Sequence, residues 1–106
     1  MTPIQLQIPK TIRVGAKRYS IEVVETMLRQ RIMGTIDYNN KTIKVGRKSN
    51  VTGRAYTQAM MMSETFWHEL THAIINDMGE DSLNKNEKFV TGFAHRLTKA
   101  IRSARF

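Results

Sequence analysis

The residues of this sequence that are best suited to chemistry lie in one short segment, His68-Glu69-Leu70-Thr71-His72. On a helix, residues four apart lie one above the other, so His68 and His72 would offer two imidazole nitrogens to one metal ion. Glu69 lies too far round the helix to be a third ligand, but it is well placed to accept a proton from a water molecule at the metal. This H-E-x-x-H pattern combines neutral imidazoles, which bind zinc, with a carboxylate that acts as a base. It therefore predicts a zinc site in which Glu69 is the catalytic residue.

A helix through this segment is also predicted by the apolar residues around it. They recur at the spacing of helical turns and comprise Ala59 to Met62, Phe66, Trp67, Leu70, Ala73, Ile74 and Met78. The two aromatic residues among them are interpreted as core packing. The predicted helix starts at about Tyr56 or Gln58 and ends at Asp77, since Gly79 is a good C-terminal stop. In the alternative interpretation, both histidines are hydrogen-bonded core residues and the motif carboxylate is a surface acid.

Two histidines are too few for a catalytic zinc, which usually has three protein ligands and a water molecule. In a metzincin, Gly would stand three residues after the second histidine, and His or Asp three residues after that Gly. The residues at these positions are Ile75 and Met78, so the sequence excludes the metzincin class. The third ligand is therefore expected from a carboxylate or an imidazole farther along the chain.

Several downstream residues are candidates for that third ligand. Glu87 is preferred, because on the last predicted helix it lies about 60° from Val90, at the border of the apolar stripe, where a side chain can point inward. Glu80 and Asp81 are the next alternatives. His95 comes last, since it lies about 140° from Val90 on the side that is expected to face solvent.

The length and composition of the chain indicate one small globular domain. The chain has 106 residues, of which 41% are apolar and 25% are charged, so it is long enough for one core and too short for two. It has no cysteine, which excludes disulfides, thiolate zinc ligands and a cysteine nucleophile. Any metal must therefore be held by histidine and carboxylate side chains.

The chain carries a formal net charge of +8, so an acidic partner or nucleic acid could bind its surface. The basic residues are dispersed along the sequence, which also fits a solvated surface that aids solubility. Residues 1–10 contain no apolar run of signal-peptide length, and no stretch approaches the length of a membrane span. We therefore expect a soluble, cytoplasmic protein that does not contact membranes.

Two β-hairpins are predicted before the motif helix. In the first, apolar and polar residues alternate over residues 12–25, on both sides of a turn at Gly15-Ala16-Lys17. The second spans residues 34–45 and turns at Asn39-Asn40-Lys41, where Asn tolerates the left-handed conformation that tight turns need. Together the hairpins predict a small antiparallel sheet.

The rest of the chain is predicted to contain irregular stretches and one more helix. Residues 1–10 are expected to be irregular, residues 27–33 to form a helical turn or a loop, and residues 46–57 to form a loop. After a connection at residues 79–82, a last helix is predicted from about Asn84 to Arg102, with an apolar stripe of Val90, Phe93, Ala94, Leu97 and Ile101. The predicted fold class is therefore α+β, with the sheet followed by the motif helix and a C-terminal helix.

Residues 65–74 and 87–94, Thr-Phe-Trp-His-Glu-Leu-Thr-His-Ala-Ile and Glu-Lys-Phe-Val-Thr-Gly-Phe-Ala, resemble the corresponding segments of small zincin-like metallopeptidases of phages and bacteria. This group is related in outline to the ImmA/IrrE-type peptidases and, more distantly, to the SprT-like peptidases. The resemblance extends over residues 11–102, and its specific part is the metal motif. It implies a minimal zincin-like fold in a bacterial or phage-infected cell.

The resemblance also implies roles for individual residues. Zinc would be held by His68, His72 and Glu87, and a metal-activated water would hydrolyse peptide bonds in a peptide or protein substrate, with Glu69 as the general base. Two other functions fit the same residues. One is a zinc-binding adaptor that has lost turnover, and the other is a basic, nucleic-acid-associated protein, such as a SprT-like protease that acts on DNA-bound proteins.

Two further features of a peptidase are expected from other parts of the chain. A residue that stabilises the oxyanion is normally needed, and the candidates are Tyr38, Tyr56 and His95. The edge of the hairpin at residues 34–45 could bind an extended peptide by strand addition, which would favour unfolded segments as substrates.

Overall fold

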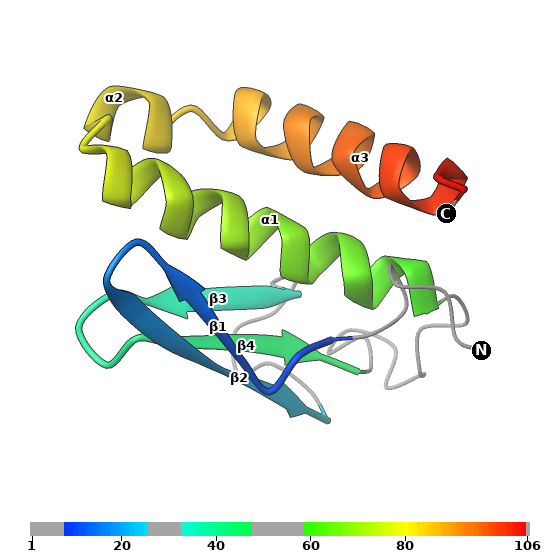
Figure 1. Ribbon diagram of the computed structural model, residues 1–106, viewed down its shortest axis with the longest axis horizontal. Coiled ribbons are helices and arrows are strands. Elements are labelled where there is room, and N and C mark those ends of the chain that lie inside the picture. The colour runs from blue at the N-terminus through cyan, green and yellow to red at the C-terminus, as the bar shows by residue number, and fades with distance from the viewer. Residues whose placement is uncertain (1–7, 26–32, 48–58, 106) are drawn as a thin grey trace.

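Four strands and three helices make up the described part of this computed structural model, which comprises residues 8–25, 33–47 and 59–105. The strands are β1 (Thr11–Val14), β2 (Lys17–Val24), β3 (Gly34–Asp37) and β4 (Thr42–Gly46), and the helices are α1 (Ala59–Met78), α2 (Asp81–Asn84) and α3 (Glu87–Ser103). Helix α1 lies between the sheet on one side and α3 on the other (Figure 1). The fold is α+β, as predicted from the sequence.

The strands form one mixed sheet in the order β1-β2-β4-β3. Strands β1 and β2 form the first predicted hairpin and β3 and β4 the second, and both pairs are antiparallel. The prediction of a wholly antiparallel sheet was wrong, because β2 and β4 pair in parallel, with Ile21 opposite Ile43. Sequence patterns reveal strand pairs that a short turn joins, whereas this pairing joins two hairpins and no turn encodes it. It leaves β1 and β3 at the edges of the sheet.

The turn between β3 and β4 is organised by the side chain of Asp37. Its Oδ1 accepts hydrogen bonds from the backbone N–H groups of Asn39 and Asn40, both at 3.0 Å. Hydrogen bonds from the backbone and side chain of Asn40 hold the pKa of Asp37 below its usual range. The left-handed residue of the turn is Lys41, with φ of 52°, so the prediction of an Asn in this conformation was wrong. The two asparagines act as hydrogen-bond donors instead.

The core lies between the inner face of the sheet and α1. Residues that point inward alternate along the strands, because successive side chains of a strand point to opposite faces. The core cluster comprises Val14, Tyr19, Ile43 and Val45 from the sheet and Phe66, Leu70 and Ala73 from α1. Phe66 is buried and Trp67 packs against the same cluster, so both aromatic residues belong to the core, as predicted. This packing fixes the rotation of α1 and turns its motif histidines toward α3.

Helix α1 ends within one residue of the predicted position. Its last residue is Met78 instead of Asp77, and its predicted start at Tyr56 or Gln58 lies outside the described residues. Gly79 has φ of 76°, a left-handed value that glycine adopts without strain, and its N–H donates to the carbonyl of residue 76 at 3.1 Å. The chain turns back at this point, so that α2 and α3 lie along α1 (Figure 1).

The connection after α1 is partly helical, because residues 81–84 form α2. Helix α3 consequently begins at Glu87 instead of Asn84. Asn86 caps α3, since its side-chain oxygen accepts a hydrogen bond from the N–H of Phe89 at 3.0 Å. The cap places Glu87 in the first turn of α3, where the positive end of the helix dipole favours a carboxylate.

The buried stripe of α3 differs from the predicted one. Val90 and Ala94 are buried as predicted, and the third buried residue is Thr98, whose hydroxyl donates to the carbonyl of Ala94 at 2.7 Å. Phe93 was wrongly predicted, because it is 47% exposed and its ring stacks on that of Phe89. The other two predicted residues are half-buried. Ala94 and Thr98, two of the three buried residues of α3, have small side chains, whereas the larger Phe93 lies on a more exposed side of the helix.

Three predicted stretches fall wholly or largely outside the described residues. They are residues 1–7, the ambiguous stretch 27–33 and the loop at 46–57. Residues 8–10 precede β1 without helix or strand, in agreement with the prediction. Within the described ranges, no helix combines the length and the apolar character needed to cross a membrane.

Candidate metal centre

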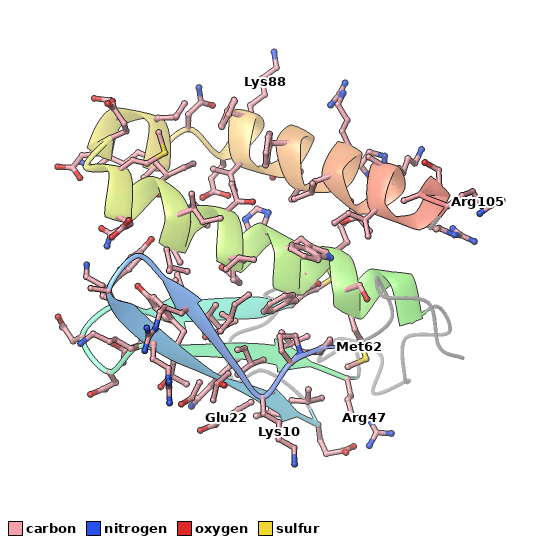
Figure 2. All side chains as sticks on the ribbon, viewed as in Figure 1. Lys10, Glu22, Arg47, Met62, Lys88 and Arg105 are labelled. Atoms are coloured by element: carbon pink, nitrogen blue, oxygen red, sulfur yellow. The ribbon has the colours of Figure 1, made fainter. Side chains whose placement is uncertain are left out.

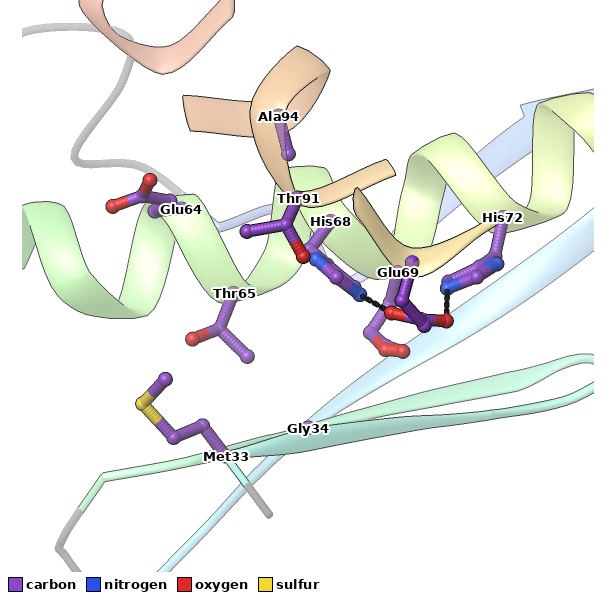
Figure 3. A pocket seen from close by; sticks show the side chains of 10 residues that line it. Met33, Gly34, Glu64, Thr65, His68, Glu69, His72, Thr91 and Ala94 are labelled. Carbon is purple, nitrogen blue, oxygen red and sulfur yellow. Dashed lines mark ion pairs between the residues drawn. The ribbon is translucent and has the colours of Figure 1, made fainter. Parts of the chain in front are cut away.

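The two motif histidines lie on one side of α1 (Figure 3), and both contact Glu87 at the start of α3. His68 Nε2 lies 3.2 Å from one carboxylate oxygen of Glu87, and His72 Nε2 lies 3.0 Å from the other. One ligand atom from each side chain lies within 4.8 Å of the other two. No other set of three His, Asp or Glu side chains in the described part of the chain meets this spacing. These residues could together hold a metal ion.

The donor atoms of this group are of the types that bind zinc, which takes imidazole nitrogens and carboxylate oxygens as ligands. The two nitrogen–oxygen separations, 3.2 and 3.0 Å, join the histidines to different oxygens of Glu87. The ring of His72 is also held from its other nitrogen, as the rings of metal-binding histidines usually are. The three side chains therefore offer suitable ligand atoms within 4.8 Å of one another.

A hydrogen-bonded chain links His72 to the turn between β3 and β4. His72 Nδ1 lies 2.7 Å from Asn84 Oδ1, and the side-chain amide of Asn84 donates to the Tyr38 hydroxyl at 3.0 Å. Since Asn84 turns its NH₂ group toward Tyr38, its oxygen faces His72 and accepts the hydrogen of Nδ1. That tautomer leaves Nε2 without a hydrogen, which is the form that binds a metal. Asn84 is therefore a positioning residue, which the sequence placed only at the start of a helix.

Replacing Asn84 with Ala is expected to weaken Zn²⁺ binding by about 10–100-fold, because His72 loses the partner that sets its tautomer and ring orientation. Asn84→Asp is the matched control, since it keeps an oxygen acceptor at the same place, and we expect it to bind Zn²⁺ about as tightly as the wild type. Competition with a chromophoric chelator measures all three affinities. Equal affinities of Asn84→Ala and the wild type would show that Asn84 does not orient His72.

Glu69 lies beside this group without belonging to it, and it is only 6% exposed. Burial raises the pKa of Glu69 to about 7; His72 opposes the rise and the charge of Glu87 adds to it. Strand β3 covers the residue closely, since a Cβ at Gly34 would lie 2.5 Å from Thr65 Cγ2 and 3.4 Å from Glu69 Cγ. Glycine at position 34 therefore lets the edge strand approach α1 beside this carboxyl group.

The surroundings of His68 favour the form of histidine that binds metals. Burial lowers the pKa of His68 and the neighbouring His72 lowers it further, whereas Glu87 opposes the shift. The imidazole is therefore neutral at pH 7, with a lone pair available to a metal ion.

Two cavities open beside the metal-binding group and meet at Glu69, His72 and Glu87, which line both. The larger cavity has a volume of about 620 Å³ and extends toward Met33, just before β3 (Figure 3). The smaller has a volume of about 520 Å³ and extends toward Tyr38. Both volumes are typical of ligand-binding sites. The group that could hold a metal is therefore open to a ligand from two sides.

The other candidates for the third ligand lie outside the group. Glu80 is the residue that precedes α2, and Asp81 lines the smaller cavity. His95 lies on α3 with its Nδ1 2.6 Å from Glu64 Oε1. Of the predicted candidates, Glu87 alone is grouped with the two histidines, and its role as a ligand stays a prediction.

One of the three oxyanion candidates lies at the site. Tyr38 lines the smaller cavity together with Glu69, whereas His95 is paired with Glu64 and Tyr56 lies outside the described residues. Burial raises the pKa of Tyr38, so its hydroxyl stays protonated at pH 7. The oxygen of this hydroxyl accepts from the Asn84 amide, which leaves its own hydrogen available for another acceptor.

The fold and the site define an α+β protein with a His-His-Glu group that could hold a metal ion. Comparisons of the chain with models of protein families, with curated proteins and with solved structures gave no match. The likeness to zincin-like peptidases therefore stays a prediction from the residues quoted above.

Proposed function

We propose that this protein is a zinc-dependent metallopeptidase. One observation carries the proposal: His68 and His72 meet Glu87 from another helix, and Glu69 lies beside them as a buried carboxyl group that is not part of the ligand set. A metal site for structural purposes uses all its positions for protein ligands, whereas three protein ligands leave one position open for a water molecule or a substrate. Three ligands and a neighbouring acid–base group are the parts that hydrolysis needs.

Zinc is the metal that this donor set suits best among the common choices. Two imidazoles and one carboxylate match the ligand types of catalytic zinc sites, and one ligand atom of each residue lies within 4.8 Å of the other two. When bound, zinc would polarise a peptide carbonyl and make a water molecule more acidic. His68, His72 and Glu87 would hold it between α1 and α3, with Asn84 orienting the ring of His72.

Glu69 and Tyr38 have the two remaining roles in this mechanism. Glu69 would accept a proton from the attacking water and pass it to the leaving amine, since its buried carboxyl group lies beside the metal-binding group without belonging to it. The Tyr38 hydroxyl would donate a hydrogen bond to the oxyanion, since its oxygen is already bonded to Asn84 and its hydrogen is available. Both residues line the smaller cavity, so a carbonyl group placed there would lie near both of them.

The position of β3 supports a peptide as the substrate. Strand β3 is at an edge of the sheet, and it begins at Gly34, which lines the larger cavity together with Glu69. An extended peptide could pair with this edge and pass across the metal-binding group. Because strand addition needs an extended backbone, unfolded segments would be better substrates than folded domains.

Metal analysis combined with a cleavage assay tests this function. Wild-type protein purified without a tag is expected to carry about one zinc per chain, and His68→Ala and Glu87→Ala are expected to lose it. The zinc-loaded wild type should cleave an unfolded protein, a chelator should stop cleavage, and added zinc should restore it. Zinc binding without any cleavage would instead favour a non-catalytic zinc-binding adaptor.

A second candidate function is nucleic-acid binding, and the surface of α3 favours it. Lys88, Arg96 and Lys99 are exposed on this helix, and Lys88 points away from α1 (Figure 2). Contacts between such residues and phosphates release counterions, so affinity for DNA would fall steeply as the salt concentration rises. A binding titration at two salt concentrations therefore separates this function from the peptidase function, which needs no DNA.

A further inference from the structure

The larger cavity is rich in acidic side chains, in a protein that is otherwise strongly basic. Three of the nine Asp and Glu residues of the chain, Glu64, Glu69 and Glu87, line this cavity. None of the described residues that line it is Lys or Arg, although the chain contains 17 of these residues. Glu87 and Glu69 have roles at the metal as ligand and as base, and Glu64 is needed for neither role.

Glu64 lies one turn before His68 on α1, toward the end of the cavity that is farther from His72 (Figure 3). His95 Nδ1 lies 2.6 Å from Glu64 Oε1, which holds the carboxylate in place from α3. This contact uses one oxygen, whereas a carboxylate offers about four lone-pair sites on its two oxygens. With its side chain 31% exposed, Glu64 can still accept hydrogen bonds from an ammonium or guanidinium group in the cavity.

The wall between Glu64 and the metal-binding group includes small and apolar side chains. Met33 contributes a flexible thioether chain, Ala94 a methyl group, and Thr91 a short side chain from α3. Lys and Arg bury their methylene stems along apolar surface and keep their charged ends at polar groups. A long cationic side chain therefore matches both the wall and the charge, an aliphatic one matches the wall alone, and an acidic one meets like charge.

We infer that the larger cavity recognises a Lys or Arg residue of the peptide substrate through Glu64, with His95 as the residue that positions the carboxylate. This specificity rests on the proposed peptidase function. Glu64 does not belong to the group that could hold the metal, so a bound dication would leave its carboxylate open to a cationic side chain. Unfolded segments rich in Lys and Arg are then the preferred substrates.

A matched set of peptides tests this specificity with the zinc-loaded protein. The peptides share one sequence, and a single residue is varied through Lys, Arg, Leu and Glu at each position next to the scissile bond. At one of these positions, the wild type is expected to cleave the Lys and Arg peptides with kcat/KM about 10-fold higher than the Leu peptide. Glu64→Gln is expected to bring this ratio close to 1, and Glu64→Lys to favour the Glu peptide. Glu22→Gln, which removes an exposed carboxylate on β2, is the control that keeps the wild-type ratio.

Zinc content shows whether each variant is folded around its metal site. Equal cleavage of all four peptides by the wild type overturns the inference and leaves the peptidase function standing. So does a Lys-to-Leu ratio that stays at the wild-type value in both Glu64 variants. If the zinc-loaded wild type cleaves no peptide at all, the peptidase function fails and the inference fails with it.

Discussion

Glu69→Gln is expected to lower peptide hydrolysis by about 10²–10⁴-fold while the protein keeps its zinc. Gln has nearly the shape of Glu, so the substitution preserves the packing of a residue that is buried beneath β3. The Glu69 carboxyl group does not belong to the set of atoms that could hold the metal, so its replacement leaves that set intact. What the variant loses is the group that accepts a proton from the attacking water.

Zinc content and kcat/KM for one peptide are measured on the same preparations. Together they distinguish the loss of the proton acceptor from the loss of a metal ligand. Glu87→Ala is the comparison, since we expect it to lose both zinc and activity, whereas Glu69→Gln loses activity alone. Full activity of Glu69→Gln would contradict the role of Glu69 as general base. Loss of zinc from this variant would instead show that Glu69 contributes to metal binding.

The part of the site that could be predicted from the sequence is largely the part that lies within one helix. Once a helix is predicted, the relative positions of His68, Glu69 and His72 follow from a constant rise and rotation per residue. Glu87 could be proposed in a similar way, because its angle to the apolar stripe of the last helix pointed it toward the motif helix. The structure brings Glu87 and both histidines together, although the prediction for that helix was wrong at Phe93.

The residues that other helices and turns bring to the site could not be predicted in this way. Asn84, Tyr38 and the pair of Glu64 and His95 depend on how α2, the β3–β4 turn and α3 pack on α1. No local periodicity encodes such contacts, because they join residues that are 12 to 46 positions apart. The sheet shows the same limit, since both hairpins were predicted from their turns and the parallel pairing between them was not.

Without bound metal, the protein is expected to lose stability through Glu69 as the pH rises from about 4.5 to about 7. Burial raises the pKa of this carboxyl group from 4.5 to about 7 in the folded chain. Below pH 4.5 the group is protonated in both the folded and the unfolded chain, so it does not change the free energy of unfolding. Between the two pKa values the unfolded chain releases the proton and the folded chain keeps it. The free energy of unfolding therefore falls, by about 3 kcal/mol in total above pH 7.

His68 contributes in the opposite direction, so a comparison with Glu69→Gln is needed. Burial lowers the pKa of His68, and the unfolded chain therefore takes up a proton first as the pH falls below 6.5, which lowers stability on the acid side. The variant keeps this contribution and lacks that of Glu69. Between pH 5 and pH 7.5, the wild type should lose about 2 kcal/mol more than Glu69→Gln in urea unfolding of chelator-treated protein. The same pH dependence in both proteins would show that Glu69 is not buried as a neutral acid.

Zinc is expected to reduce the loss of stability that Glu69 causes at high pH. This expectation links the stability measurement to the proposed chemistry. A dication beside the carboxyl group favours its charged form and lowers its pKa. In zinc-loaded protein, the extra loss of stability of the wild type at pH 7.5 should therefore shrink or disappear. A loaded protein that shows less of this loss than the metal-free protein would place the bound ion close to the Glu69 carboxylate, where a general base has to lie.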